Sequence, residues 1–255
     1  MLAALLVFVG LEVLRSGRET AALRRTPAAV QDTSMVAAAP AAAQQPAATD
    51  SLALQGHTPE TPAKMDRAEL RRRIEVAAAG TYIGDMLADR DSMLTRWPNR
   101  TFNPIRVWVQ RSSTIPDWTP DLARAARAAF DEWAEVGCPV RFMFVADSTN
   151  ADIRVNFADR MADGNRLGVT THRHDQDGWI VGAEIQIATH DTSGKALPQT
   201  LIAATARHEV GHALGLAHSK DRATLMFPES QTTTITGPDR ATLKLLYTLP
   251  PGSVK

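Results

Sequence analysis

The sequence contains a single cysteine, Cys138, and this scarcity excludes several kinds of site. One thiol cannot form an internal disulfide, a four-cysteine zinc site or a C-x-x-C pair. Because Cys138 lies between a predicted helix and a predicted strand, a buried small hydrophobic residue is favoured over a reactive thiol. Neither charge is in excess, since Lys plus Arg and Asp plus Glu both number 28. No basic field therefore argues for a nucleic-acid partner.

A long apolar run is missing at the N-terminus. Leu2 to Leu14 is interrupted by Gly10 and Glu12 and is too short to span a bilayer comfortably. Its length suits a signal-peptide core, but no basic residue precedes it, and the arginines that follow oppose export of the rest of the chain. Three interpretations of residues 1–25 stay open: a truncated signal with a mis-assigned start, a membrane anchor, or a disordered cytoplasmic tail.

Composition divides the rest of the chain into three parts. Residues 26–65 are rich in Ala, Pro, Gln and Thr and are predicted to be a disordered linker, because they cannot bury enough apolar surface. A helical stripe runs from 66 to 96 and stops at Trp97-Pro98, which predicts a helical N-terminal extension over 66–100. Residues 101–255 are predicted to form the main folded domain.

The strongest signal is a motif of the form H-E-x-x-H-x-x-G-x-x-H between His208 and His218. His208 and His212 would lie one helical turn apart and could bind one metal ion. Glu209 could address a water at the metal without taking a coordination position. Gly215 can end the helix in the left-handed conformation, so that His218 returns as a third ligand. Three imidazoles with one open position indicate a catalytic zinc ion, because structural zinc usually has four protein ligands.

The motif, with Ser219 directly after it and Met226 and Pro228 downstream, resembles the metzincin zinc peptidases and, among them, the matrixins, including bacterial-type members. The resemblance implies an α+β fold. It would contain a mixed twisted sheet, an active-site helix, and a small C-terminal subdomain with a Met-turn and a final helix. Met226 would form the apolar floor beneath the metal.

The resemblance also implies a function. Residues 101–255 would be a zinc-dependent endopeptidase domain, with His208, His212 and His218 on one Zn²⁺ and Glu209 as general base. The partner would be a protein or peptide substrate, the location extracytoplasmic (secreted or membrane-anchored through the N-terminus), and the state a monomer. One alternative is a non-catalytic zinc-binding interaction module tethered at a membrane, although such a site needs no base. Another is a membrane-tethered interaction protein whose function lies in residues 1–100.

Periodicity predicts the elements around the motif. A hairpin is expected from 167–174 and 179–188, joined by the turn at 175–178. By resemblance, the strand around 168–171 would run along the cleft and pair with an extended substrate. Thr236 and Asp239 resemble a capping box, whereas the matrixin pattern would tie an aspartate near here to the Met-turn; both interpretations stay open. Further predictions are strands at 105–109, 141–145 and 153–157, a helix at 120–136, and a helix from Pro198 in which Gly211 permits close approach to the sheet.

Other metal ions have weaker support. Matrixins carry a structural zinc on three histidines and an aspartate, but the loop at 158–166 has no histidine, and His172 and His174 lack a matching partner spacing. The aspartates at 175, 177 and 191 could bind calcium, although solvated turn carboxylates are favoured and nothing further supports Ca²⁺.

The extension at 66–100 has two interpretations, a scaffold for the catalytic domain or an inhibitory pro-segment. Matrixin zymogens are held latent by a pro-segment cysteine on the zinc. No cysteine precedes Cys138, so that mechanism is excluded.

Overall fold

The computed structural model of the chain describes residues 66–90, 92–162 and 166–253. The predicted N-terminal apolar segment (1–25) and the predicted linker (26–65) lie outside the described residues. Among the helices that are described, none combines the length and the apolar character needed to cross a membrane.

The centre of the fold is a five-stranded mixed sheet with the order β3-β2-β4-β6-β5. Four strands, β3, β2, β4 and β6, are parallel to one another, and β5 pairs antiparallel with β6 at one edge of the sheet. The hairpin predicted around residues 175–178 is therefore confirmed, and the predicted cleft strand is an edge strand of this sheet. The strands are β2 (Arg100–Val109), β3 (Val140–Phe144), β4 (Ile153–Ala158), β5 (Gly168–His174) and β6 (Ile180–Ala188), with a short 3₁₀ turn, η1 (Ser148–Asn150), between β3 and β4.

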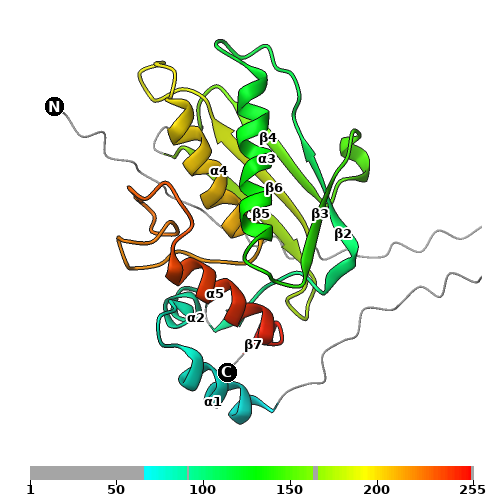
Figure 1. Cartoon of the computed structure of the whole chain (residues 1–255), viewed down its shortest axis with the longest axis vertical. Helices are drawn as coiled ribbons and strands as arrows, with labels where there is room; N and C mark the ends of the chain where they lie inside the picture. Colours follow the sequence, from blue (N-terminus) through cyan, green and yellow to red (C-terminus); the bar gives the residue numbers. More distant parts are fainter. Residues whose placement is uncertain (1–65, 91, 163–165, 254–255) are drawn as a thin grey trace, which may run out of the picture. The chain divides into compact units, whose positions relative to one another are not determined.

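Two long helices, α3 (Pro120–Ala134) and α4 (Gln199–Ala213), lie side by side across one face of the sheet (Figure 1). The predicted stripe of α3 is buried, and the indole of Trp133 donates a hydrogen bond to the carbonyl of Arg207 in α4 at 2.8 Å. The apolar side chains that alternate along the strands fill the space beneath the helices. They include Ile105, Val107, Val109, Ile153, Val155, Ile185 and Ile187, all buried.

The single helix predicted over residues 66–96 is wrong. The chain forms α1 (Arg67–Ala77) and α2 (Ile83–Asp89), and Gly80 between them has a φ of +74°. Glycine adopts this left-handed conformation at little cost, and it interrupts a helix. The apolar stripe continues past Gly80 because each helix has its own buried residues, Leu70 and Ile74 on α1 and Ile83 and Met86 on α2. After α2 the chain enters β1 (Met93–Leu94).

The segment before the sheet packs against the end of the chain. β1 pairs antiparallel with β7 (Gly252–Ser253), and α2 lies beside α5 (Gly237–Thr248) (Figure 1). The backbone amide of Tyr82 donates to the hydroxyl of Thr242 at 3.0 Å, and its phenol donates to Asp239 at 3.2 Å. The α+β fold with a small C-terminal subdomain is thus confirmed, and residues 82–94 complete that subdomain.

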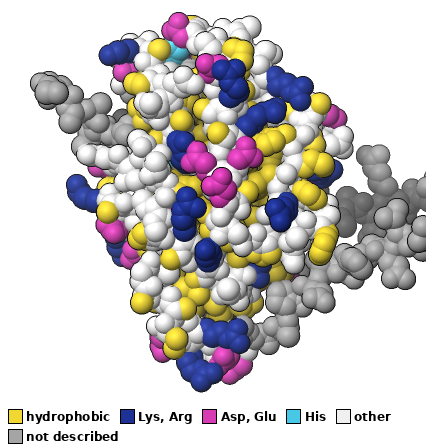
Figure 2. All heavy atoms as spheres, viewed as in Figure 1, with side chains coloured by type: hydrophobic (Ala, Val, Ile, Leu, Met, Phe, Trp, Pro, Cys, Tyr) yellow, Lys and Arg dark blue, Asp and Glu magenta, His cyan; other side chains and the backbone are white. Residues whose placement is uncertain are grey.

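The surface agrees with the balanced composition. On the face seen in Figure 2, basic and acidic side chains are interspersed, with apolar patches between them. That face carries no field of one sign. Cys138 is half-buried against the core, and burial raises the pKa of its thiol to about 11. The thiol therefore stays protonated at neutral pH, in agreement with its interpretation as a small hydrophobic residue.

Candidate metal centre

The C-terminal end of α4 is a tight turn centred on Gly215. The amide of Leu216 donates to the carbonyl of Gly211 at 3.1 Å, and the amide of Gly215 donates to the carbonyl of His212 at 2.8 Å. These two bonds, with a φ of +105° at Gly215, form the Schellman motif. The predicted helix end is confirmed. The turn reverses the chain and brings His218 back towards α4.

Three histidines converge beside this turn. The Nε2 atom of His212 lies 3.0 Å from Nε2 of His208 and 3.2 Å from Nε2 of His218. Two nitrogens on one tetrahedral zinc ion are about 3.3 Å apart, given Zn–N distances of about 2.0–2.1 Å. The spacing therefore fits one zinc ion. Within the described residues, this is the one group of three or more potential metal-binding side chains whose donor atoms all lie within 4.8 Å of one another.

The other ring nitrogens of two of these histidines are held by backbone carbonyls. Nδ1 of His208 lies 2.8 Å from the carbonyl oxygen of Leu225, and Nδ1 of His212 lies 2.8 Å from that of Leu216. A carbonyl oxygen only accepts, so each Nδ1 must carry the proton. Each Nε2 then presents a lone pair towards the centre, which is the form that binds a metal.

Burial also keeps the three rings neutral. It lowers the pKa of His208 to about 3 and that of His218 to about 4, and it holds the pKa of His212 well below its usual range. An imidazole must be unprotonated to bind a metal. At neutral pH all three rings are therefore in the required form.

Glu209 directly follows His208 in α4, is buried, and is held by the edge strand β5. The hydroxyl of Thr170 shares its proton between Oε2 of Glu209, at 2.7 Å, and the main-chain carbonyl of Glu209, at 2.9 Å. A Cβ atom on Gly168 would lie 2.5 Å from Oε1, so glycine is needed to leave room for the carboxylate. Burial raises the pKa of Glu209 to about 8, and the Thr170 hydrogen bond opposes that rise.

Neither of these two partners of Glu209 has a signal in the sequence that links it to Glu209. Strand alternation puts positions 168 and 170 on one face of β5. No local pattern, however, pairs that face with the side of α4 that carries Glu209.

Met226 packs beneath α4, directly against Gly211. A Cβ atom on Gly211 would lie 2.6 Å from the sulfur of Met226 and 3.1 Å from the ring of Trp133. The prediction that Gly211 permits close approach of helix to sheet is therefore wrong. The missing side chain makes room for the methionine turn and for α3.

Asp239 both caps α5 and holds the turn that contains Met226. Its carboxylate accepts from the amide of Thr236 at 2.8 Å within a complete capping box. It also accepts from the amides of Leu225 at 3.0 Å and Met226 at 3.4 Å. Both interpretations kept open for Asp239 thus apply together, since one carboxylate has enough acceptor sites for both roles.

Ser219 and Pro228 lie on either side of the methionine turn. Ser219 is buried, its amide donates to the carbonyl of Met226 at 2.9 Å, and its hydroxyl accepts from the amide of Asp221 at 3.0 Å. Pro228 is half-buried in the next turn, which closes through the amide of Ser230 and the carbonyl of Phe227 at 3.1 Å. Both residues thus lie in the turns that follow the third histidine.

Among the other described histidines, His172, His174 and His190 do not belong to this cluster. His172 is buried 3.5 Å from the hydroxyl of Thr95, and burial lowers its pKa to about 3. His190 lies between two carboxylates, with Nδ1 2.9 Å from Asp159 and Nε2 3.3 Å from Asp117. Because the two ring nitrogens face different carboxylates, this arrangement does not converge on one ion.

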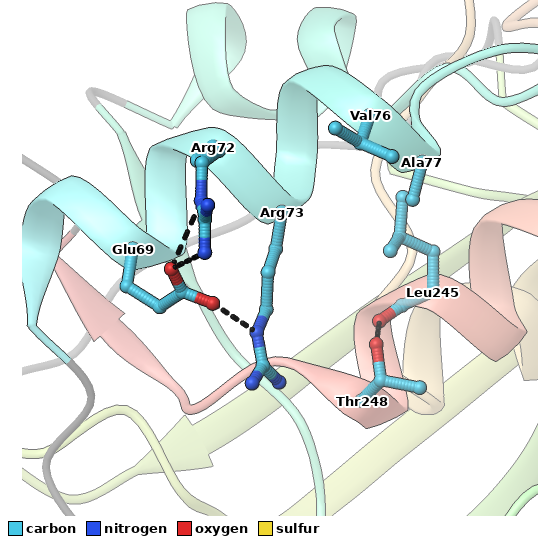
Figure 3. Close-up of a pocket in the computed structure, with 7 residues that line it drawn as sticks. All are labelled: Glu69, Arg72, Arg73, Val76, Ala77, Leu245 and Thr248. Atoms are coloured by element: carbon cyan, nitrogen blue, oxygen red, sulfur yellow. Dashed lines mark hydrogen bonds and ion pairs between the residues drawn. The ribbon is translucent and has the colours of Figure 1, made fainter.

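A surface groove between α1 and α5 is separate from the histidine cluster. It has a volume of about 370 Å³ and is lined by apolar and charged side chains (Figure 3). Arg72 and Arg73 both point to Glu69 across its rim. Neither the three clustered histidines nor Glu209 lines it. Its lining residues are Glu69, Arg72, Arg73, Val76, Ala77, Leu245 and Thr248.

The chain is similar in sequence to one protein family and to several known proteins. Residues 108–248 match the model of the matrixin family. Macrophage metalloelastase of Oryctolagus cuniculus is 34% identical over 134 residues, which cover 48% of this chain and 28% of that protein. Neutrophil collagenase of Homo sapiens is 32% identical over 133 residues, covering 48% and 28%. Metalloendoproteinase 1-MMP of Arabidopsis thaliana is 31% identical over 116 residues, covering 42% and 32%.

The chain thus spans less than a third of the length of these curated relatives. Among solved structures, the crystal structure of myroilysin matches with a TM-score of 0.40 and 16% identity, covering 60% of this chain and 86% of that one.

Proposed function

The chain belongs to the matrixin family, and from this premise we propose that it is a zinc-dependent endopeptidase. The observation that carries the proposal is the convergence of three imidazole Nε2 atoms, with the buried carboxylate of Glu209 on the residue that directly follows the first of these histidines in α4. His208, His212 and His218 would hold one zinc ion, and the fourth position would stay open for chemistry.

Zinc, when bound, acidifies water and polarises a carbonyl group, which are the two needs of peptide-bond hydrolysis. The chain itself would contribute Glu209 as the group that accepts and returns a proton. Glu209 accepts a proton from the water while the water oxygen forms a bond to the scissile carbonyl carbon. It then gives that proton to the leaving amine as the carbon–nitrogen bond breaks. A neighbouring cation favours the ionised carboxylate that this role requires.

Thr170 and Gly168 hold the carboxylate in position for this transfer. The Thr170 hydroxyl bonds Oε2 at 2.7 Å, and the absent side chain of Gly168 leaves space at Oε1. Both lie on β5, the antiparallel edge strand. An extended protein or peptide substrate would add to that edge through main-chain hydrogen bonds. Substrate and general base would then be aligned by the same strand.

We infer that residues 66–100 act as a scaffold for the catalytic domain at 101–255 and not as an inhibitory segment. Supporting observations are the burial of Tyr82, Leu94 and Trp97 and the contacts of α2 with α5. We further propose a monomer that works outside the cytoplasm, as a secreted protein or one tethered through its N-terminus.

The test of the proposed activity is Glu209→Gln, which keeps the shape of the side chain but removes the base. We expect it to retain zinc while kcat falls by roughly 10²–10⁴. Zinc content is measured by metal analysis and cleavage by mass spectrometry of a peptide library. Glu184→Gln, on the exposed side of β6, is the matched control and should cleave like the unmodified protein. Undiminished peptide cleavage by the Glu209→Gln protein would refute the assignment of Glu209 as the general base.

The competing function is a zinc-binding module that captures a partner without cleaving it. The same library distinguishes the two. A zinc-loaded protein that cleaves no peptide, with chelator making no difference, would favour the binding module.

A further inference from the structure

The last carbonyl groups of α4 need donors from outside the helix, because they have no partner within it. Two of these donors are aromatic side chains. The indole of Trp97 donates to the carbonyl of Ala213 at 2.8 Å, and the phenol of Tyr247 donates to that of Leu214 at 3.1 Å. Trp97 precedes the residues matched by the matrixin model, and Tyr247 lies near their end.

Arg90 serves the next two carbonyls. It directly follows α2 and is half-buried. Its Nη1 donates to the carbonyl of Gly215 at 3.1 Å and to the hydroxyl of Thr95 at 2.8 Å, and its Nη2 donates to the carbonyl of Leu216 at 3.2 Å. One planar guanidinium thus bridges two consecutive carbonyls of the turn between the second and third histidines of the motif.

The carbonyl of Leu216 connects this clamp to the metal centre. It accepts from Nη2 of Arg90 and also from Nδ1 of His212, at 2.8 Å. The position of this oxygen therefore sets the direction in which Nε2 of His212 points. A group that orients a metal-binding histidine through its second nitrogen affects metal affinity strongly.

Thr95 fixes the same turn from another side. A Cβ atom on Gly215 would lie 2.2 Å from the carbonyl oxygen of Thr95, so the two backbones are in direct contact. The hydroxyl of Thr95 holds the guanidinium of Arg90. The clamp is thus built from a segment that contains none of the three histidines.

We propose that Arg90 is a positioning residue for the metal centre: it fixes the carbonyls of Gly215 and Leu216 and thereby orients His212 and the return of the chain to His218. This inference rests on the proposed zinc site. It extends the functional unit to a residue that precedes the family-matched residues 108–248.

The experiment measures zinc affinity of the full chain by competition with a chelator of known affinity. Arg90→Met, which keeps most of the side-chain volume, should bind zinc at least about tenfold more weakly. The zinc affinity of Arg90→Lys should lie between those of Arg90→Met and the unmodified protein, because an ammonium group cannot reproduce the planar guanidinium that spans two carbonyls. The matched control is Arg154→Met on β4, which removes a half-buried arginine that donates to the carbonyl of Ser148 at 2.9 Å. It should bind zinc within about twofold of the unmodified protein.

Cobalt substitution supplies a second readout, because the visible spectrum of Co²⁺ reports the geometry of its ligands. The spectrum should change in Arg90→Met and stay unchanged in Arg154→Met. Unaltered zinc affinity and an unaltered cobalt spectrum in Arg90→Met would overturn the inference, even if the metal-free protein were less stable. If Arg90→Met does not fold, Arg90→Lys and Arg90→Gln are judged by the same two measurements. An unmodified protein that binds no zinc would instead contradict the proposed function itself.

Discussion

Two stretches of the chain meet at the metal centre, and they contribute in different ways. The family-matched stretch, 108–248, supplies all three converging histidines and Glu209. The preceding stretch, 66–97, supplies none of these side chains, yet Arg90 and Trp97 bond to carbonyls at the end of α4. Motif spacing thus brings the three imidazole groups together, whereas groups remote in sequence bond to the backbone carbonyls next to them.

The largest effect should come from removing the preceding stretch altogether. Deletion of residues 1–97 removes the fully buried side chains of Ile83, Met86, Leu94 and Trp97. Truncating one buried tryptophan already costs about 3–5 kcal/mol, which is comparable with the whole stability of many domains. We expect insoluble or unfolded protein, judged by circular dichroism and size-exclusion chromatography.

Deletion of residues 1–79 is the matched comparison, because it removes α1 but keeps α2. It should leave a folded protein, since α1 buries only Leu70 and Ile74. A soluble 98–255 fragment with raised peptidase activity would contradict the scaffold interpretation and favour an inhibitory segment.

A smaller effect is expected where the two stretches touch. Gly215→Ala would bring a Cβ atom to 2.2 Å from the carbonyl oxygen of Thr95, at a φ of +105°. Left-handed backbone and forced overpacking together should lower the free energy of unfolding by roughly 3 kcal/mol. Urea unfolding measures this loss in the free energy of unfolding. Gly194→Ala, also at positive φ but with nothing within 4 Å, separates the backbone cost from the contact, and equal losses in both variants would argue against the contact.

His172, on β5, faces the hydroxyl of Thr95 in the preceding stretch, and its protonation should make the stability of the protein depend on pH. Burial lowers its pKa from 6.5 to about 3, so the unfolded chain binds a proton that the folded chain does not. Its contribution to stability is complete above pH 6.5 and is lost as the pH falls from 6.5 towards 3, by about 2 kcal/mol at pH 5. His172→Gln should therefore lose less stability between pH 7 and pH 5 than the unmodified protein, when both are unfolded with urea in chelator. Identical losses would show that His172 does not titrate in this way.

The smallest effect is expected at the far end of the preceding stretch. Arg72 is exposed on α1, and its partner Glu69 is partly exposed. Figure 3 shows the pair. Exposed ion pairs contribute little, so Arg72→Ala should leave the Tm within about 1 °C and zinc affinity unchanged. A clear loss of zinc affinity in this variant would mean that the whole of 66–97, and not only its last part, supports the metal centre.

Much of the fold could be read from local pattern. Strand alternation predicted the edge hairpin β5–β6, and the Thr236–Asp239 spacing predicted the capping box that opens α5. Gly215 predicted the end of α4, because a left-handed residue there is nearly free of cost only for glycine. Each of these features depends on residues a few positions apart, and so the sequence shows it directly.

Local pattern misled where neighbours came from elsewhere in the chain. The stripe past Gly80 suggested one helix, because the buried residues of two successive short helices can have the spacing of a single helix. Gly211 was assigned to the sheet, but the atoms that need its space belong to Met226 and Trp133. Thr170 and Glu209 form a direct hydrogen bond. Because the two residues are 39 positions apart, no local pattern identified Thr170 as the partner of Glu209.

The sequence by itself determined which side chains are available to hold a metal and to carry a proton, since the motif places them on consecutive turns of one helix and just beyond its end. Only the tertiary structure decided how they are aimed. Arg90 and Leu216 are 126 positions apart, and Tyr82 and Asp239 are 157 apart. Such bonds form because folding brings distant backbone and side-chain groups into one buried space where each polar group must find a partner, and no repeat in the sequence records which partner that is.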